Sequence, residues 1–250
     1  NCFEDNDTTC LNSPVGPTDR ENYTGKNLVY EESIKQLYPK EATRWRSYYQ
    51  HDTYNFNEII KTENGHPALG DIMSAFSNYI FYQKLHILRD IESHHLFEVF
   101  TSFLIVLGIS IIVYSELGTL PAIVSSFALA SYPLFFAESH FNIKDPPEAA
   151  FFGLTIIFFY FGIIKNKWQY LILSPIFAAF AVGTKFNAFF IAPILGLWFI
   201  YYLAIRVWNK SKIKLPIFSL LLYPFIVIFI FYISWPYLWD SPLHNFLNIV

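Results

Sequence analysis

The stretch that decides the fold is Trp168–Ile205, WQYLILSPIFAAFAVGTKFNAFFIAPILGLWFIYYLAI, an apolar run of 38 residues with a single charge at Lys185. At about 1.5 Å per residue, one helix of this length would reach roughly 57 Å, whereas the hydrocarbon core of a bilayer is only about 30 Å thick. Two spans that reverse at Gly183-Thr184-Lys185 fit a bilayer, because Lys185 can then reach the membrane surface. The run therefore predicts two membrane helices rather than one.

Other apolar runs extend this pattern over most of the chain. They cover about Leu96–Ser115, Leu120–Ala137, Pro147–Ile164 and Pro216–Ser234. With the two halves of the long run they make about six spans within residues 96–250. The composition agrees, since 54% of the residues are hydrophobic and only 15% are charged. We expect an all-α polytopic membrane protein that is a fragment of a longer chain, because the sequence begins at Asn1 and its last residues, NFLNIV, suggest a helix that continues.

Residues 1–95 differ from the rest in being polar. They carry 14 of the 20 acids and 9 of the 17 bases. Cys2 and Cys10 either close a small disulfide loop on an oxidising side of the membrane or remain free thiols. No basic patch with interleaved aromatic residues indicates a nucleic-acid partner. This third of the chain is predicted to be a large extracytoplasmic loop with interfacial helices.

Two helices are predicted inside this polar third. One covers about Leu28–Leu37. The other covers residues 68–83, whose periodicity is typical of a helix that lies in the membrane interface or packs on the bundle. Its predicted apolar face consists of Leu69, Ile72, Met73, Phe76 and Ile80.

The distribution of charge predicts which ends of the spans share a side. Loops 165–167 and 206–214 carry six of the eight bases found after residue 95, and no acid. The positive-inside rule makes their side cytoplasmic. Residues 1–95, the polar island Glu138–Pro147 (ESHFNIKDPP), Lys185 and residues 235–242 (WPYLWDSP) then share the outer side. Ionisable groups between spans mark a functional site, so the island is predicted to form one wall of an outward-facing site.

Several stretches resemble motifs of GT-C glycosyltransferases, in particular those of family 39. Thr18–Tyr23 (TDRENY) resembles the Asp-Glu-x-x-aromatic motif of the first outer loop, and Asn64–Gly70 (NGHPALG) resembles the His-Pro-Pro-Leu-Gly-Lys segment of protein O-mannosyltransferases and of relatives such as the lipid A aminoarabinose transferases. Lys144–Pro147 (KDPP) matches the helix-start Asp after the third membrane helix. Gly183–Lys185 is similar to the Gly-x-x-x-x-x-Lys region of the same relatives.

This sequence departs from the family pattern at specific positions. Ala68 stands in place of the second proline and Asp71 in place of the lysine. The acidic pair is Asp19-Arg20, so the second acid is either missing or shifted to Glu21. The gap from Asp19 to His66 is 47 residues, longer than in the O-mannosyltransferases. An insertion explains the gap, or the true anchor is Glu41, which is nearer to His66.

The resemblance implies an integral membrane glycosyltransferase that uses a sugar on a polyprenyl phosphate. An outer-loop carboxylate, Asp19 or Glu21, would act as general base toward a protein, lipid or glycan acceptor. Lys185 would stabilise the leaving phosphate. No cofactor is implied with certainty; a divalent cation is an option. The other residues implied to contact substrate are His66, His140, Lys144, Asp145 and Asp240.

Each of these assignments has a structural alternative. In the structural alternative, Asp19 is a solvated loop acid and Lys185 is a lysine that snorkels to the membrane surface. Asp145 is then an N-cap of the helix that begins at Pro146. His66 shapes the turn before the helix at 68–83. The aromatic residues of the last segment form an interfacial belt or stack on sugar: Trp235, Tyr237 and Trp239.

The alternative function is a non-catalytic polytopic protein, either a transporter subunit or an inactive relative that binds lipid. Transporters place their charges near the midplane and are often built from inverted repeats. The charges of this chain instead cluster toward one face, and no repeat is visible in the sequence. The pattern therefore favours the enzyme.

Overall fold

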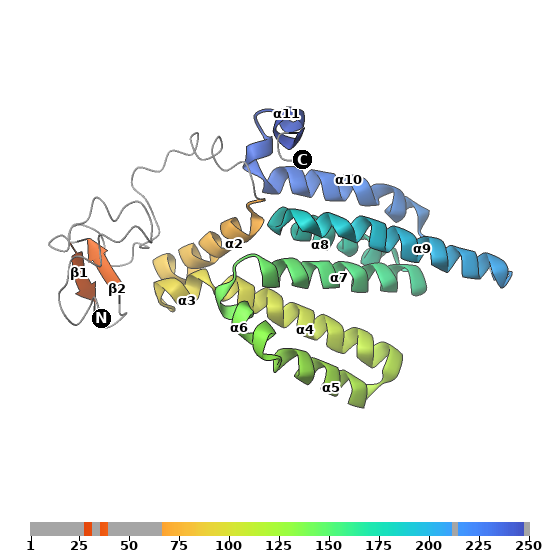
Figure 1. The fold of residues 1–250 in the computed structure, drawn as a ribbon, viewed down its shortest axis with the longest axis horizontal. Helices are drawn as coiled ribbons and strands as arrows, with labels where there is room; N and C mark the ends of the chain where they lie inside the picture. Colours follow the sequence, from red (N-terminus) through yellow and green to blue (C-terminus); the bar gives the residue numbers. More distant parts are fainter. Residues whose placement is uncertain (1–27, 32–35, 40–66, 212–214, 248–250) are drawn as a thin grey trace.

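The computed structural model describes residues 28–31, 36–39, 67–211 and 215–247 (Figure 1). Several residues singled out from the sequence lie outside these ranges: Cys2, Cys10, Asp19, Glu21, Glu41 and His66.

A bundle of long apolar helices makes up most of the described chain. Four segments are long and apolar enough to cross a membrane, and a bent pair makes a possible fifth. The elements are α4 (Leu96–Leu117), α5 (Thr119–Ala130), α6 (Pro133–Phe141), α7 (Asp145–Ile164), α8 (Trp168–Thr184), η5 (Phe186–Phe190), α9 (Ile191–Trp208) and α10 (Ile217–Ser234). The predicted all-α polytopic membrane fold is therefore confirmed.

The long apolar run breaks where its length requires a break. α8 ends at Thr184, and Lys185 has extended backbone angles, φ −151° and ψ 134°, before η5 and α9 continue the chain. In Figure 1, α7 and α9 run away from the end near α2, and α8 and α10 run back toward it. The predicted reversal at Lys185 is confirmed, and the loop at 165–167 lies at the same end of the bundle as the end of α9.

α8 is the central helix of the bundle and packs against both α7 and α10. Its buried residues are mostly small, among them Ala178, Ala181 and Gly183, and small residues let helix backbones approach closely in a membrane. A polar link joins the three helices, because the Ser174 hydroxyl donates to the Thr155 carbonyl at 2.9 Å and lies 3.0 Å from the Tyr223 hydroxyl. These contacts hold α8 between α7 and α10, and they thereby fix the position of its C-terminal end and of Lys185.

The second predicted span, 120–137, is bent. α5 and α6 meet at an angle of 58°. The break precedes Pro133, and Tyr132 has the extended backbone, φ −67° and ψ 117°, that a residue before proline favours. α6 continues to Phe141, so the first four residues of the polar island form its last turn rather than a loop. Only residues 142–144 connect α6 to α7.

Helix α2 (Leu69–Asn78) turns its polar side inward. Its buried residues include Ser74, Ser77 and Asn78, whereas Ile72 and Phe76 are exposed. The prediction of a helix here is confirmed, and Leu69 is buried as an apolar anchor. The apolar face nonetheless points mainly outward, which suits a helix whose surroundings are lipid rather than water. From Tyr79 to Lys84 the chain continues as a π-helix, η4.

Buried hydrogen bonds hold α2 against α4 and against α3 (Asp90–His94). Glu98, in the first turn of α4, is fully buried, and its Oε1 lies 3.5 Å from the Ser74 hydroxyl and 3.3 Å from Nδ1 of His95. The Asn78 amide donates to the Asp90 carboxylate at 2.6 Å. Buried polar groups need such partners, so the inward polar side of α2 specifies where the helix docks.

The segment after α10 belongs to the core rather than to an aromatic belt. Trp235 is 1% exposed and Tyr237 8% exposed, and both pack in one cluster with Phe97, Phe151 and Val182. Only Trp239 is exposed, and its indole N–H donates to the Tyr232 carbonyl. The belt predicted for these residues is therefore wrong for two of the three, because η6 (Pro236–Leu238) folds the chain back over the helix ends. A short helix, α11 (Pro242–Leu247), follows.

The predicted helix at Leu28–Leu37 is also wrong. This stretch contains β1 (Leu28–Glu31) and part of β2 (Gln36–Pro39), which pair antiparallel with Leu28 opposite Pro39 and Glu31 opposite Gln36. The strands are rich in residues with high β-propensity, such as Val29, Tyr30 and Tyr38, and this preference outweighs the weak helical periodicity.

We predict that Gly70→Ala destabilises the protein by about 1–3 kcal/mol. A Cβ at position 70 would lie 2.7 Å from the Ile143 carbonyl oxygen, and a backbone atom cannot move aside as a flexible side chain can. Gly196→Ala is the matched control, because a Cβ there meets nothing within 4 Å and alanine favours the helix. The melting temperature in detergent should fall for Gly70→Ala and stay level or rise for Gly196→Ala. Equal melting temperatures would contradict the close packing at Gly70.

Candidate functional site

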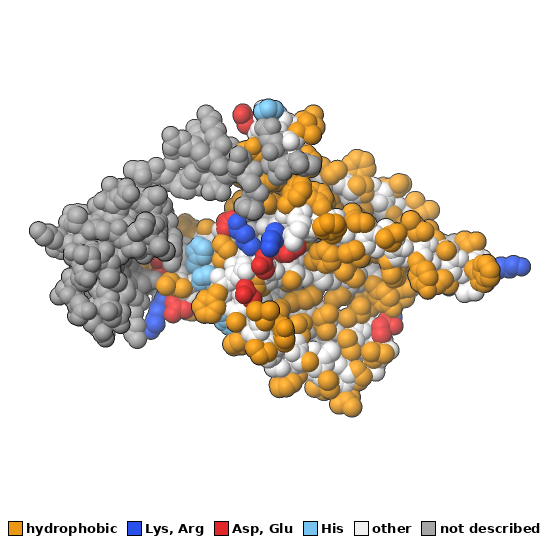
Figure 2. Space-filling model, in the orientation of Figure 1, with side chains coloured by type: hydrophobic (Ala, Val, Ile, Leu, Met, Phe, Trp, Pro, Cys, Tyr) orange, Lys and Arg blue, Asp and Glu red, His pale blue; other side chains and the backbone are white. Residues whose placement is uncertain are grey.

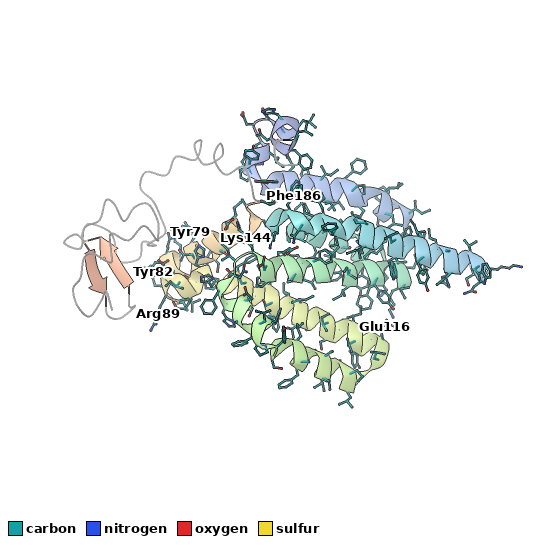
Figure 3. All side chains as sticks on the ribbon, viewed as in Figure 1. Tyr79, Tyr82, Arg89, Glu116, Lys144 and Phe186 are labelled. Carbon is teal, nitrogen blue, oxygen red and sulfur yellow. The ribbon has the colours of Figure 1, made fainter. Side chains whose placement is uncertain are left out.

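Polar side chains gather where the start of α2, the α6–α7 connection and the end of α8 meet. Figure 2 shows blue and red side chains together at the middle of the face drawn, in a surface that is otherwise largely orange. In Figure 3, Lys144 and Phe186 lie at this end of the bundle, while Glu116 lies at the opposite end. We call this group the polar cluster; its members are Asp71, Glu138, Asn142, Lys144, Asp145 and Lys185.

The cluster is centred on the first turn of α7. The Asn142 side-chain oxygen accepts hydrogen bonds from the backbone N–H groups of Lys144 and Asp145, each at 3.0 Å. Asn142 therefore caps the helix, whose first N–H groups would otherwise lack partners. Asp145 is the first residue of α7 rather than its cap, so the N-cap interpretation of this residue is wrong. Its carboxylate is left to make other contacts.

The central contact joins Asp145 to Lys185 across 40 residues of sequence. The Lys185 ammonium donates to Oδ1 of Asp145 at 2.5 Å, and both side chains are partly exposed. This hydrogen bond is the main reason that the pKa of Lys185 is raised above its usual value, and the charges of Asp145 and Glu148 add to the effect. Because the pKa is raised, the ion pair stabilises the fold at neutral pH. This stabilisation is lost only as the pH rises through the raised pKa. An exposed pair of this kind contributes at most about 1 kcal/mol, so its geometry matters more than its energy.

A second ion pair joins α2 to the connection between α6 and α7. The Lys144 ammonium lies 3.5 Å from Oδ2 of Asp71, the residue that stands where the related motif has lysine. Burial lowers the pKa of His94, and this effect outweighs the opposite effect of the Asp71 carboxylate. His94 is therefore neutral at pH 7. Lys144 thus places an ammonium group beside position 71, where the related motif has a lysine of its own.

Backbone contacts set the spacing of these elements. Gly70 packs directly on the Ile143 carbonyl and beside the Thr184 side chain, and Gly183 packs on Ser234 and Leu69. The glycines of the two motif-like stretches are thus the points at which α2, α8 and the α6–α7 connection touch. Three stretches that resemble family motifs meet at one place: residues 67–70, 144–147 and 183–185.

Two other predicted site residues that the structure describes, His140 and Asp240, are not joined to the cluster. His140 is exposed, and its Nδ1 contacts the Phe136 carbonyl of its own helix at 2.7 Å. Asp240 is exposed, and in the described ranges no hydrogen bond or ion pair connects it to the cluster. The same residues include no group of three or more His, Cys, Asp or Glu placed to hold a metal ion. Of the predicted site residues, the structure therefore brings together Lys144, Asp145 and Lys185.

Asn142 and Asp71 were not predicted as site residues. Asn142 had a usable signal, because asparagine two to three residues before a helix start often caps that helix through its side-chain oxygen. Asp71 had none, since its partner Lys144 is far away in sequence.

An apolar cavity of about 380 Å³ lies between α7, α8, η5, α9 and α10. Its lining includes Val182 and Phe189, which flank Lys185 in sequence, and reaches Gly196, Tyr223 and Pro224 further along the bundle. The cavity therefore begins about one helical turn from Lys185 along the chain and extends among the apolar helices.

We predict that Asp145→Asn makes the Lys185 amine more reactive. Loss of the carboxylate removes the main cause of the raised pKa of Lys185, so at a fixed alkaline pH more of the amine is unprotonated and acetylation is faster. Lys167, at the opposite end of the bundle, serves as the internal control. Acetylation rates measured by peptide mass spectrometry should rise at Lys185 alone. Unchanged Lys185 reactivity would mean that the ion pair does not form.

Comparison with known protein families gives a match that spans this arrangement. The sequence profile of the dolichyl-phosphate-mannose-protein mannosyltransferase family matches residues 66–235, which include the whole polar cluster. No curated protein and no solved structure matches the chain. The profile covers more than half of the chain, and the apolar helices agree with it. The chain belongs to the dolichyl-phosphate-mannose-protein mannosyltransferase family and is a GT-C membrane glycosyltransferase of the mannosyltransferase type.

Proposed function

We propose that this protein transfers a sugar from a polyprenyl-phosphate donor to a hydroxyl or amine acceptor, with the polar cluster at the donor phosphate. The observation that carries the proposal is the position of Lys185. Its ammonium lies at the end of the central helix, is held by Asp145, and is flanked in sequence by residues that line the apolar cavity. A lysine is well suited to hold a phosphate at such a boundary, since its charge is compact and mobile.

The reaction needs a base and a stabilised leaving group. The acceptor oxygen or nitrogen attacks the anomeric carbon, the bond from that carbon to the phosphate oxygen breaks, and the lipid phosphate leaves with the electron pair. A carboxylate of the first loop, Asp19 or Glu21, takes the acceptor proton. Lys185 stabilises the charge that grows on the phosphate, and Lys144 adds a second cation in the cluster. Asp145 holds Lys185 in place and can orient the acceptor.

The apolar cavity supports a lipid-linked donor. In this proposal an isoprenoid chain fills the cavity, which α9 and α10 help to line, while its phosphate lies beside Lys185. The lining from Val182 to Tyr223 is apolar apart from the tyrosine hydroxyl, which is occupied by Ser174. Burial of such a chain contributes about 0.8 kcal/mol per CH₂, so the cavity can supply much of the donor affinity.

We infer that the polar cluster faces the extracytoplasmic side. The basic loop at 165–167 lies at the end of the bundle opposite the cluster, where Lys165 is 3.8 Å from Glu116, and the basic end of α9 lies there too (Figure 1). The positive-inside rule places that end in the cytoplasm. Residues 1–95 then form an outer loop, and the transfer takes place outside.

The sidedness has a direct test by cysteine labelling. In a variant without Cys2 and Cys10, cysteines introduced at Lys210 and at Asp145 should react with a membrane-impermeant maleimide from opposite sides of intact vesicles. The physical reason is that the two positions lie at opposite ends of spans α7 and α9. Labelling of both positions from one side would overturn the topology.

The chemistry is tested by transfer assays with candidate polyprenyl-phosphate sugars. Asp19→Asn should slow transfer by about 10²–10⁴-fold, because the amide keeps the shape but cannot accept a proton. Lys185→Met should lower both the rate and the apparent donor affinity, because it removes a charge near the phosphate in both bound and transition states. Lys167→Met, at the opposite end, is the matched control and should leave both unchanged.

Each outcome of the assay is informative. An Asp19→Asn rate within about threefold of the parent would move the base to Glu21 or Glu41, since loss of a general base costs far more. A Lys185→Met enzyme with parental rate and donor affinity would refute the phosphate contact. The Arg20 departure from the acidic pair favours one other candidate, an inactive relative that binds the lipid donor. That candidate is supported if the parent protein binds polyprenyl phosphate but transfers no sugar.

A further inference from the structure

Asn142 uses every polar atom of its side-chain amide. Its oxygen accepts the N–H groups of Lys144 and Asp145, and its nitrogen donates to Oε2 of Glu138 at 2.9 Å and to Oδ2 of Asp145 at 3.0 Å. The amide therefore lies between two backbone donors on one side and two carboxylates on the other. Reversing its oxygen and nitrogen would set donors against donors and acceptors against acceptors, so one orientation is specified.

These contacts fix the orientation of Asp145 from two directions. Asn142 holds Oδ2, and Lys185 holds Oδ1 at 2.5 Å. Both carboxylate oxygens are thus engaged, and a rotation of the Asp145 side chain would break one bond or the other. The position of the Lys185 ammonium depends on Asp145, and that of Asp145 depends on Asn142.

The same amide allows two carboxylates to lie near each other. Glu138 and Asp145 both accept from Asn142 Nδ2, so a neutral donor separates two negative charges that would otherwise repel. Among side chains of similar size, aspartate offers only acceptors, and serine or threonine has a single donor. Asparagine alone combines an acceptor for the helix start with two donors for the carboxylates.

We propose that Asn142 is a positioning residue of the transferase site, which aligns Asp145 and through it directs Lys185 toward the donor phosphate. This inference rests on the proposed function, in which Lys185 contacts that phosphate. Its role differs from helix capping, which needs only the side-chain oxygen. The amide nitrogen does the positioning, so the two roles can be separated by substitution.

Asn142→Asp separates them. Aspartate keeps an oxygen for the backbone N–H groups and is itself a favoured cap, but it loses both donors and adds a charge beside Glu138 and Asp145. The melting temperature should stay near that of the parent. Transfer should fall by about 10- to 100-fold, since misplacement of a reacting group by about 1 Å can cost 10²-fold. Asn166→Asp, the same change at the opposite end of the bundle, should leave transfer unchanged.

A compensating change gives the sharper test. In the double variant Asn142→Asp with Glu138→Gln, the net charge of the cluster returns to that of the parent, but residue 142 still has no N–H group to donate to Asp145. We expect this double variant to stay impaired in transfer, because the hydrogen bond that aligns Asp145 is missing. Recovery of the parental rate would show that the added charge alone impairs Asn142→Asp and would refute the positioning role. Glu138→Gln alone should not raise the rate above that of the parent.

The outcomes separate this inference from the proposed function. If Lys185→Met impairs transfer but Asn142→Asp does not, the positioning role is refuted and the phosphate contact stands. If Asn142→Asp lowers the melting temperature and the rate together and the double variant restores both, the added charge explains the loss and the inference fails. If Lys185→Met leaves rate and donor affinity at parental levels, the proposed phosphate contact fails first, and the inference falls with it.

Discussion

A charged lysine is costly in hydrocarbon, and Lys185 lies near the middle of an apolar run too long for one span. This constraint forces the chain to reverse at Lys185 and to bring that residue to the membrane surface. The rest of the bundle follows from it. α8 becomes the central helix, α9 returns to the opposite end, and the Lys185 ammonium meets the first turn of α7, where Asp145 accepts its hydrogen bond. The central ion pair thus arises from a rule about length and charge in a bilayer.

The polar cluster is assembled from helix ends rather than from any one element. α6 contributes Glu138, the connection contributes Asn142 and Lys144, α7 contributes Asp145, α2 contributes Asp71, and Lys185 follows α8. Helix ends have backbone groups without helical partners, so they attract polar side chains and ordered contacts. A membrane enzyme can collect its polar chemistry at such ends and keep its spans apolar. The bend before α6 serves this arrangement, because it lets the last turn of that helix approach the start of α7.

Much of the fold followed from the sequence because length and hydropathy constrain membrane helices strongly. The reversal at Lys185 was predicted from the length of the apolar run, and the grouping of Lys144, Asp145 and Lys185 from sidedness and the family resemblance. The burial of Trp235 and Tyr237 was not, because an aromatic residue at a span end packs inward or faces lipid according to how the following chain folds. The strands at 28–31 and 36–39 were missed because short segments carry little periodicity. Asn142 had a signal as a cap, but its contacts with Glu138 and Asp145 depend on the geometry of the turn. The role of Asp71 depends on a partner 73 residues away. Asp19, Glu21 and His66 stay predictions.

The contact at Gly70 makes the resistance of α2 to displacement depend on the direction of the displacement. Gly70 rests on the Ile143 carbonyl at a distance too short for even one added carbon, and Leu69 packs beside Gly183. Repulsion between atoms rises steeply on compression, so α2 cannot be pushed further onto the α6–α7 connection. Displacement away is opposed by softer interactions, among them the Lys144–Asp71 pair, the packing of Leu69 and the buried hydrogen bonds of Ser74 and Asn78. The contact therefore resists displacement of α2 toward the α6–α7 connection more strongly than displacement away from it. A force that draws α2 away from the bundle would act on Lys144 through its ion pair with Asp71. A force that presses α2 onto the bundle would be resisted at the contact between Gly70 and the Ile143 carbonyl.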